Sequence, residues 1–275
     1  MPPVGESESY ALSKDFWEQT FNLTGSSHLL TVVKRQEDGS FILDNAEATR
    51  QAIDDKLQKL PIDAKEHPNI YKAADEFVKN QQKEGLEKAV SIGVSHKANR
   101  FFNDLVRERV FGKAKKILEK GDLLMVTRNW HRNGISLFNG DHVELLEVDW
   151  NLEETVADLH FVAVKVRLLF SETEVIIEDL AILDCILATG GSITPSQENH
   201  LRHQRTLKNQ IFRTSTNPAD DRYVGALRLM YGNAITCNKA QGGEWKKVFI
   251  NTWGIPSLKW QYTAITRAQE DLEKF

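Results

Sequence analysis

The chain has 275 residues, of which 41% are hydrophobic and 27% charged, so it predicts a globular protein of one large or two modest domains. The formal net charge of −4 does not favour a strongly basic nucleic-acid-binding protein. No apolar run approaches the roughly 20 residues of a membrane helix, and no secretory signal follows Met1. Cys185 and Cys237 lie far apart without metal-ligand spacing, which indicates reduced thiols, no metal site and a cytoplasmic location.

One segment is locally basic. Between Lys97 and Arg132 the chain carries 10 lysines and arginines against 4 acidic residues. Such a segment is either a surface that contacts nucleic acid or a solvated helix face. Charge alone favours the solvated helix face.

The first half of the chain predicts helices and short buried strands. Helices are expected over residues 11–21, 45–57 and 73–83, and a strand over residues 29–36. The apolar run 89–94 is typical of a buried parallel strand, and Ser95 is placed to cap a helix over residues 97–111. That helix is expected to bury a stripe of five residues. They are Phe101, Phe102, Leu105, Val106 and Val110.

The middle of the chain predicts a small antiparallel β unit. A strand over residues 121–127 is followed by the tight turn Asn139-Gly140-Asp141. Further β-prone runs cover residues 142–148, 159–169 and 174–180. A polar helix over residues 195–212 and a second helix over residues 220–230 are expected to follow.

The last stretch places a polar turn between two strands. The strand 234–236 precedes a turn that contains Lys239, Gly242 and Gly243, and the apolar strand 248–250 follows. Arg267 comes at the end of a short helix. Backbone N–H groups in a glycine turn and a planar guanidinium suit a surface that contacts phosphate. An ordinary strand–turn–strand connection explains the same residues about equally well.

The strings themselves favour the functional interpretation. Residues 236–245 read T-x-x-K-x-Q-G-x-E-W and residues 262–268 read Y-T-A-I-T-R-A. They resemble motifs V and VI of RecD-like superfamily-one DNA helicases, in the expected order. Residues 30–36, L-T-x-V-x-R-Q, resemble motif IV, and residues 2–6, PPVGE, resemble the end of motif III.

The resemblance implies an α/β fold: a RecA-like parallel-sheet domain, called 2A, with an inserted SH3-like barrel, called 2B. Residues 1–28 would be a remnant of the first motor domain, residues 29–138 and 216–275 the two parts of 2A, and residues 139–215 the insertion. The expected activity is that of the C-terminal part of an ATP-dependent DNA helicase. ATP with Mg²⁺ would be shared with the N-terminal motor domain or parent chain, and single-stranded DNA would be the other partner.

The resemblance also assigns residues. Arg35 and Arg267 would stabilise the charge that builds on the γ-phosphoryl group. Gln36, Gly242 and Glu244 would contact the nucleotide. The residues assigned to the nucleic-acid backbone are Thr236, Asn238, Lys239, Ser95, His96 and Asn99.

The sequence departs from the family at several points. Asn238 replaces a usual histidine, and Asn233 and Gln261 replace an aromatic and an apolar residue, which is expected to weaken packing. No G-x-x-x-x-G-K-[ST] loop and no D-E-x-x motif occurs. We therefore expect a truncated chain that is inactive alone. A non-enzymatic module that binds nucleic acid or a partner, or a decayed relic, is the alternative.

Overall fold

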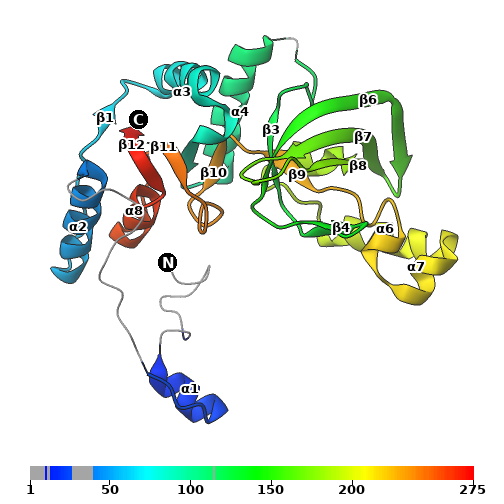
Figure 1. Ribbon diagram of the computed structural model, residues 1–275, viewed down its shortest axis with the longest axis horizontal. Helices are drawn as coiled ribbons and strands as arrows, with labels where there is room; N and C mark the ends of the chain where they lie inside the picture. The colour runs from blue at the N-terminus through cyan, green and yellow to red at the C-terminus, as the bar shows by residue number, and fades with distance from the viewer. Residues whose placement is uncertain (1–9, 11–12, 27–39, 114) are drawn as a thin grey trace.

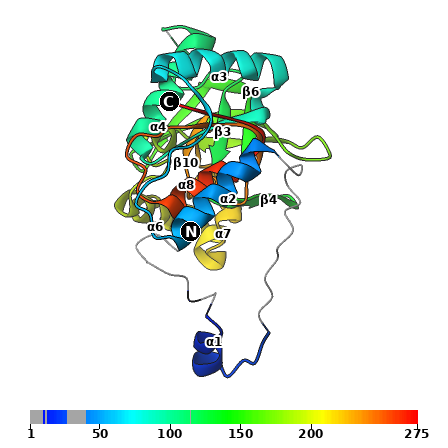
Figure 2. The same ribbon diagram turned by 90° about the vertical axis from the view of Figure 1, so that its left-hand side faces the viewer.

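The computed structural model describes residues 10, 13–26, 40–113 and 115–275. Their elements form a mixed α/β structure with one lobe built on a parallel sheet and a second on an antiparallel sheet (Figure 1). Helix α1 (Lys14–Phe21) begins after Ser13, whose side chain accepts from the N–H of Phe16, and it has no buried residue. It stands apart from both sheets in two views at right angles (Figures 1 and 2).

The first sheet has the strand order β1-β12-β11-β2-β10, and every neighbouring pair is parallel. Its strands are β1 (Lys65–Glu66), β2 (Ala89–Gly93), β10 (Ala234–Thr236), β11 (Trp245–Ile250) and β12 (Ala268–Lys274). The predicted strands at 89–94, 234–236 and 248–250 are confirmed. Because all neighbours are parallel, the carboxyl ends of the strands share one edge of the sheet and the amino ends share the other.

Helices cover both faces of this sheet, as a parallel sheet requires. Helices α3 (Ile70–Glu84) and α4 (His96–Phe111) enclose one apolar cluster around Phe77, Phe102 and Phe249. Helices α2 (Phe41–Asp54) and α8 (Leu258–Ile265) enclose another on the opposite face. Figure 2 shows α3 and α4 together, with α2 and α8 below them.

Two details of the predicted helices need correction. The second helix begins at Phe41 rather than at residue 45, because the Ser40 hydroxyl accepts from the N–H of Leu43 and caps it there. In α4, Phe101 and Val110 are each 45% exposed and do not belong to the buried stripe. The remaining three residues of the stripe are buried as predicted.

The second sheet is antiparallel, with the strand order β8-β7-β6-β3-β9. Its strands are β3 (Leu123–Val126), β6 (His142–Val156), β7 (Leu159–Leu168), β8 (Ile176–Ile182) and β9 (Leu229–Tyr231). A separate hairpin pairs β4 (Trp130–Arg132) with β5 (Ile135–Leu137). The predicted β-rich middle of the chain is confirmed. Leu227, just before β9, also bridges to Ala181 of β8.

The prediction of a helix over residues 220–230 is wrong. A 3-10 turn, η3 (Pro218–Asp220), is followed by an extended segment that ends in β9. Leu227, Leu229 and Tyr231 all enter the core of the second sheet, and this spacing of two residues is typical of a strand.

The polar helix over residues 195–212 is two helices, α6 (Pro195–Lys208) and α7 (Gln210–Ser215). Asn209 separates them because its side chain caps α7 and also donates to the carbonyl of Asp220. The short helices η2 (Leu86–Lys88) and α5 (Leu183–Leu187) complete the described elements.

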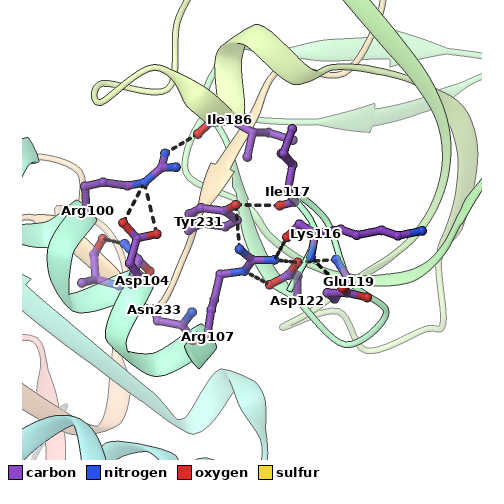
Figure 3. A network of polar contacts seen from close by, with 12 residues as sticks. Arg100, Asp104, Arg107, Lys116, Ile117, Glu119, Asp122, Ile186, Tyr231 and Asn233 are labelled. Atoms are coloured by element: carbon purple, nitrogen blue, oxygen red, sulfur yellow. Dashed lines mark hydrogen bonds and ion pairs between the residues drawn. The ribbon is translucent and has the colours of Figure 1, made fainter. Parts of the chain in front are cut away.

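A buried polar network joins the two sheets (Figure 3). Arg107 of α4 donates from Nε to Asp122 Oδ1 at 2.6 Å and from Nη2 to Asp122 Oδ2 at 3.0 Å. Its Nη1 donates to the hydroxyl of Tyr231 at 2.9 Å, and that hydroxyl donates to the carbonyl of Ile117 at 2.6 Å. Burial raises the pKa of Tyr231 to about 12. The network fixes β3 and β9 of the second sheet against a helix of the first.

The arginines of the basic segment form ion pairs with acidic residues of the same chain. Besides Arg107, Arg109 pairs with Asp75, Arg128 with Glu198 and Arg132 with Asp179. Arg100 pairs with Asp104, and its guanidinium lies 4.8 Å from the ring centre of Tyr231. These arginines are therefore held by acidic partners, whereas four lysines of the same segment, Lys97, Lys113, Lys116 and Lys120, remain exposed.

Within the described ranges, no helix combines the length and the apolar character that crossing a membrane would require. Cys185 and Cys237 are both buried and free.

The buried ion pair yields a test of stability. Asp122→Ala leaves the guanidinium of Arg107 without its carboxylate in a site where the two side chains are 1% and 3% exposed. We expect the free energy of unfolding to fall by about 3–5 kcal/mol in urea denaturation. Glu47→Ala, which removes the exposed partner of Arg50, is the control and should cost under about 1 kcal/mol. Equal losses would contradict a structural role for the buried pair.

A second test uses His142, the first residue of β6, whose ring is in edge contact with Trp245 of the first sheet at 5.8 Å. Burial lowers the pKa of His142 from 6.5 to about 4. Between pH 6.5 and pH 4, His142 is therefore protonated in the unfolded chain but neutral in the folded protein. The free energy of unfolding consequently decreases as the pH falls from 6.5 towards 4.

Between pH 7 and pH 5 this group should remove about 2 kcal/mol from the free energy of unfolding. Urea titrations at both pH values should show a smaller loss in His142→Gln, which cannot titrate. An identical loss in the variant and the parent protein would refute the assignment.

Candidate functional site

Six residues selected from the sequence meet at the carboxyl edge of the parallel sheet. Strands β2 and β10 are neighbours, and the last residue of each, Gly93 and Thr236, are paired in register. Ser95, His96 and Asn99 follow β2, and Asn238 and Lys239 follow β10. The topology therefore brings to one edge two groups of residues separated by some 140 positions in the sequence.

Ser95 and Asn99 have well-defined structural roles in the first turn of α4. The Ser95 hydroxyl accepts from the N–H of Ala98 at 3.1 Å, so Ser95 is the helix N-cap. Asn99 is 3% exposed, and its Oδ1 lies 2.2 Å from where a Cβ on Gly93 would be. Only glycine fits at position 93. Among the described residues, Asn99 Nδ2 has no hydrogen-bond partner, so one buried donor remains available at this edge.

Lys239 is half-buried beside His96. Burial lowers the pKa of Lys239, and burial together with the positive charge of Lys239 lowers the pKa of His96. No acidic group contributes to the lysine's shift, and within the part of the chain that the structure describes Lys239 forms no ion pair. A desolvated cation without an acid beside it favours the binding of an anion.

The turn over residues 237–244 runs from the carboxyl end of β10 to the amino end of β11 (orange in Figure 1). Successive backbone bonds hold it: Ala240 N–H donates to Thr236 O at 3.0 Å, and Gly243 N–H to Ala240 O at 3.1 Å. Gly242 has φ +88°, and a Cβ on Gly243 would lie 2.3 Å from the Trp245 ring. Gly242 is therefore required by the backbone conformation, and Gly243 by the Trp245 ring that packs against it.

Arg267 lies at the opposite, amino edge of the sheet, just before β12. Its Nη1 donates to the carbonyl of Gly243 at 3.2 Å, and its Nε donates to the carbonyl of Thr263 at 3.1 Å. The N–H of Trp245 donates to the Arg267 carbonyl at 3.0 Å. Glu244, in the same turn, accepts from Gln269 at 3.1 Å. Glu244 and Arg267 thus both lie at the amino edge, and Gly242 is two residues before Glu244 in the same turn.

Arg35 and Gln36, and the PPVGE segment, lie outside the described residues.

A cavity of about 970 Å³ separates the turn from the second sheet. Its lining comes from the turn, from residues 139–142 and from residues 168–171, and it includes Lys239, Glu244 and Phe170. His142, which is buried, also lines the cavity and is in edge contact with Phe170 at 6.1 Å. The loops of the second sheet therefore face the turn.

The two residues expected to weaken packing both form hydrogen bonds within the fold. Asn233 is buried, and its Oδ1 accepts from Gln81 Nε2 of α3 at 2.9 Å. Gln261 is buried as well, and its Nε2 donates to the carbonyl of Leu60 at 3.0 Å. Each polar side chain is satisfied by a hydrogen bond that ties the motif to a neighbouring element.

Sequence analysis missed two residues of the carboxyl edge, Asn251 and Trp253, which follow β11. The sequence feature that could have pointed to them is a tryptophan in a polar, glycine-containing turn at the end of an apolar strand. That turn type is common, so the string alone did not single it out.

Comparison with known proteins gives a match for one segment of the chain. Residues 231–272, from β9 to near the end of β12, match the sequence profile of the family described as UvrD-like helicase C-terminal domain. A search of curated proteins finds no match.

Solved structures of Pif1 helicases are similar in fold. The enzyme from Candida albicans aligns with a TM-score of 0.50 and 14% identity over 89% of this chain and 55% of that chain. The Bacteroides enzyme, in complex with ADP-AlF3 and single-stranded DNA, aligns with a TM-score of 0.48 and 13% identity over 100% of this chain and 59% of that chain. The chain thus spans little more than half of these helicases. Its fold matches that of a helicase motor domain, with a C-terminal segment of UvrD-like helicase type.

Proposed function

We propose that this chain is the second motor domain, 2A with its 2B insertion, of a RecD-like superfamily-one DNA helicase. It supplies arginines to an ATP site shared with the first motor domain, and it carries part of the track for single-stranded DNA. ATP is bound with Mg²⁺ between the two domains.

The observation that carries the proposal is the path of the turn 237–244. Its first residues lie at the carboxyl edge with Ser95 and His96, and its last residues lie at the amino edge against Arg267. A single short segment therefore connects a candidate nucleic-acid site to a candidate nucleotide site. A change at one end has a direct covalent route to the other, which is what coupling between two ligands requires.

The carboxyl edge suits a DNA backbone. Thr236, Asn238 and Ser95 offer uncharged hydrogen-bonding groups, and Lys239 offers one cation with no acid beside it. Groups of this kind position a phosphate chain without distinguishing bases.

The amino edge suits a nucleotide phosphate. The guanidinium of Arg267 donates to the carbonyls of Thr263 and Gly243 and to the Thr266 hydroxyl, which fixes its orientation. In the proposal Arg267 and Arg35 stabilise the transferring γ-phosphoryl group, Gly242 and Glu244 approach the sugar–phosphate edge of the nucleotide, and Gln36 contacts the nucleotide as well.

The second sheet is proposed to be the SH3-like 2B insertion, with wider limits than the residues 139–215 expected from the sequence, because its strands β3 and β9 lie outside that range. The bridge between Leu227 and Ala181 supports this, because it links the segment before β9 to β8, the opposite edge of the sheet. Two hydrogen bonds accompany it, from Leu227 N–H to Leu180 O at 2.7 Å and from Ile182 N–H to Leu227 O at 3.1 Å.

Removing the lysine tests the DNA site. Lys239→Ala should weaken binding of a fluorescent oligo-dT strand about tenfold, because a charge-assisted phosphate contact is lost. Fluorescence anisotropy at fixed salt measures the effect. The control is Lys113→Ala, an exposed lysine just beyond the carboxyl end of α4, far from His96 at its start. Equal weakening in both variants would show that only net charge matters and would refute the site.

An ATPase assay tests the shared nucleotide site. Because the sequence has no phosphate-loop lysine, the chain with saturating single-stranded DNA should show no steady-state turnover above background. Turnover of about 1 per second or faster that disappears in Arg267→Ala would contradict the need for a second motor domain.

A further inference from the structure

Trp253 is 79% exposed, the highest value among the large hydrophobic side chains in the described ranges. Leaving an indole in water is unfavourable. The residue lies in the loop after β11, three residues past the end of that strand. Its position therefore calls for an explanation other than folding.

The loop holds Trp253 in place through its backbone. Asn251 Oδ1 accepts from the Trp253 N–H at 3.1 Å, and Asn251 N–H donates to Ile92 O of β2 at 2.9 Å. Thr252 donates to the Phe275 carbonyl from both its N–H and its hydroxyl, each at 2.9 Å. The chain then turns at Gly254, which has φ +73°. The indole is thus presented by an ordered turn and costs little entropy to immobilise.

This turn lies on the same edge as the proposed DNA site. Strands β10, β2 and β11 are consecutive in the sheet. A Cβ on Gly93 would lie 3.6 Å from Asn251 Cβ, and the same glycine contacts Asn99, whose Nδ2 is buried without a partner. The residues after β11 therefore continue the row formed by those after β10 and β2.

Space is available beside the indole. A hollow of about 610 Å³ adjoins Trp253 and is lined by five other residues. They are Ile70, Asn251, Thr252, Gly254 and Phe275. Ile70 and Phe275 are half-buried, so the tryptophan is the one strongly exposed aromatic in this lining. A strongly exposed indole held by a polar turn offers a flat face on which a nucleobase can stack.

We propose that Trp253 is a stacking platform for a nucleobase of the single strand that follows the carboxyl edge. The inference rests on the proposed function and extends the track from β10 and β2 to a third strand, β11. Since every base has a π face, this contact adds affinity without sequence preference.

Two oligonucleotides distinguish the role of the base. One is a labelled oligo-dT strand and the other an abasic strand of equal length and charge. By anisotropy, Trp253→Ala should bind oligo-dT about tenfold more weakly than the parent chain, and Trp253→Phe should retain most of the affinity. The abasic strand should bind the parent chain and Trp253→Ala equally. The control is Phe138→Ala, an aromatic of 60% exposure in the turn before β6 of the second sheet.

The outcomes separate this inference from the function on which it rests. A parent chain that binds no oligo-dT overturns both. A parent chain that binds, together with Trp253→Ala of unchanged affinity, overturns the stacking platform alone. Equal weakening of Trp253→Ala on both strands also overturns it, because the tryptophan would then support the turn or contact the backbone rather than a base.

Discussion

The connection between β10 and β11 is the constraint on which the site depends. Parallel strands are usually joined by a crossover of about a dozen residues or more, often a helix. Here residues 237–244 alone cross from one edge of the sheet to the other while passing β2. So short a path needs Gly242 at positive φ and Gly243 against the ring of Trp245. The same path sets Lys239 at one edge and Glu244 near the other.

The charge distribution determines what kind of ligand contact is possible. The arginines of the basic segment are committed to ion pairs that hold α4, the second sheet and the hairpin together. What remains at the carboxyl edge is Lys239 together with the exposed Lys97 in the first turn of α4, among hydroxyl and amide groups. In the proposed function, binding of a strand there therefore depends on hydrogen bonds to its backbone, on stacking and on a small number of phosphate contacts. A track of this kind can release and rebind a strand readily, which the proposed motor needs.

Much of this architecture could be predicted from local signals. The strand β2 and the Ser95 cap were predicted because periodicity and capping are local, and the motif strings supplied the six candidate residues, but their meeting at one edge depends on the pairing of β2 with β10. The network of Arg107, Asp122 and Tyr231 could not be predicted, since its members are distant in sequence and each alone resembles a surface residue. The prediction of a helix over residues 220–230 was wrong because the pairing of β9 with β3 outweighs the local helix propensity of this segment. Trp253 was missed because exposure is a property of the tertiary structure.

The central claim is that a single strand follows the carboxyl edge of the parallel sheet. Hydrogen–deuterium exchange with and without oligo-dT tests this most directly, because it locates protected backbone amides without any substitution. The account predicts that added strand slows exchange in residues 94–99, 236–240 and 251–254 and leaves the helical arm 195–215 unchanged. Protection confined to that arm, or to residues 243–245 and 267–269 at the amino edge, would contradict it.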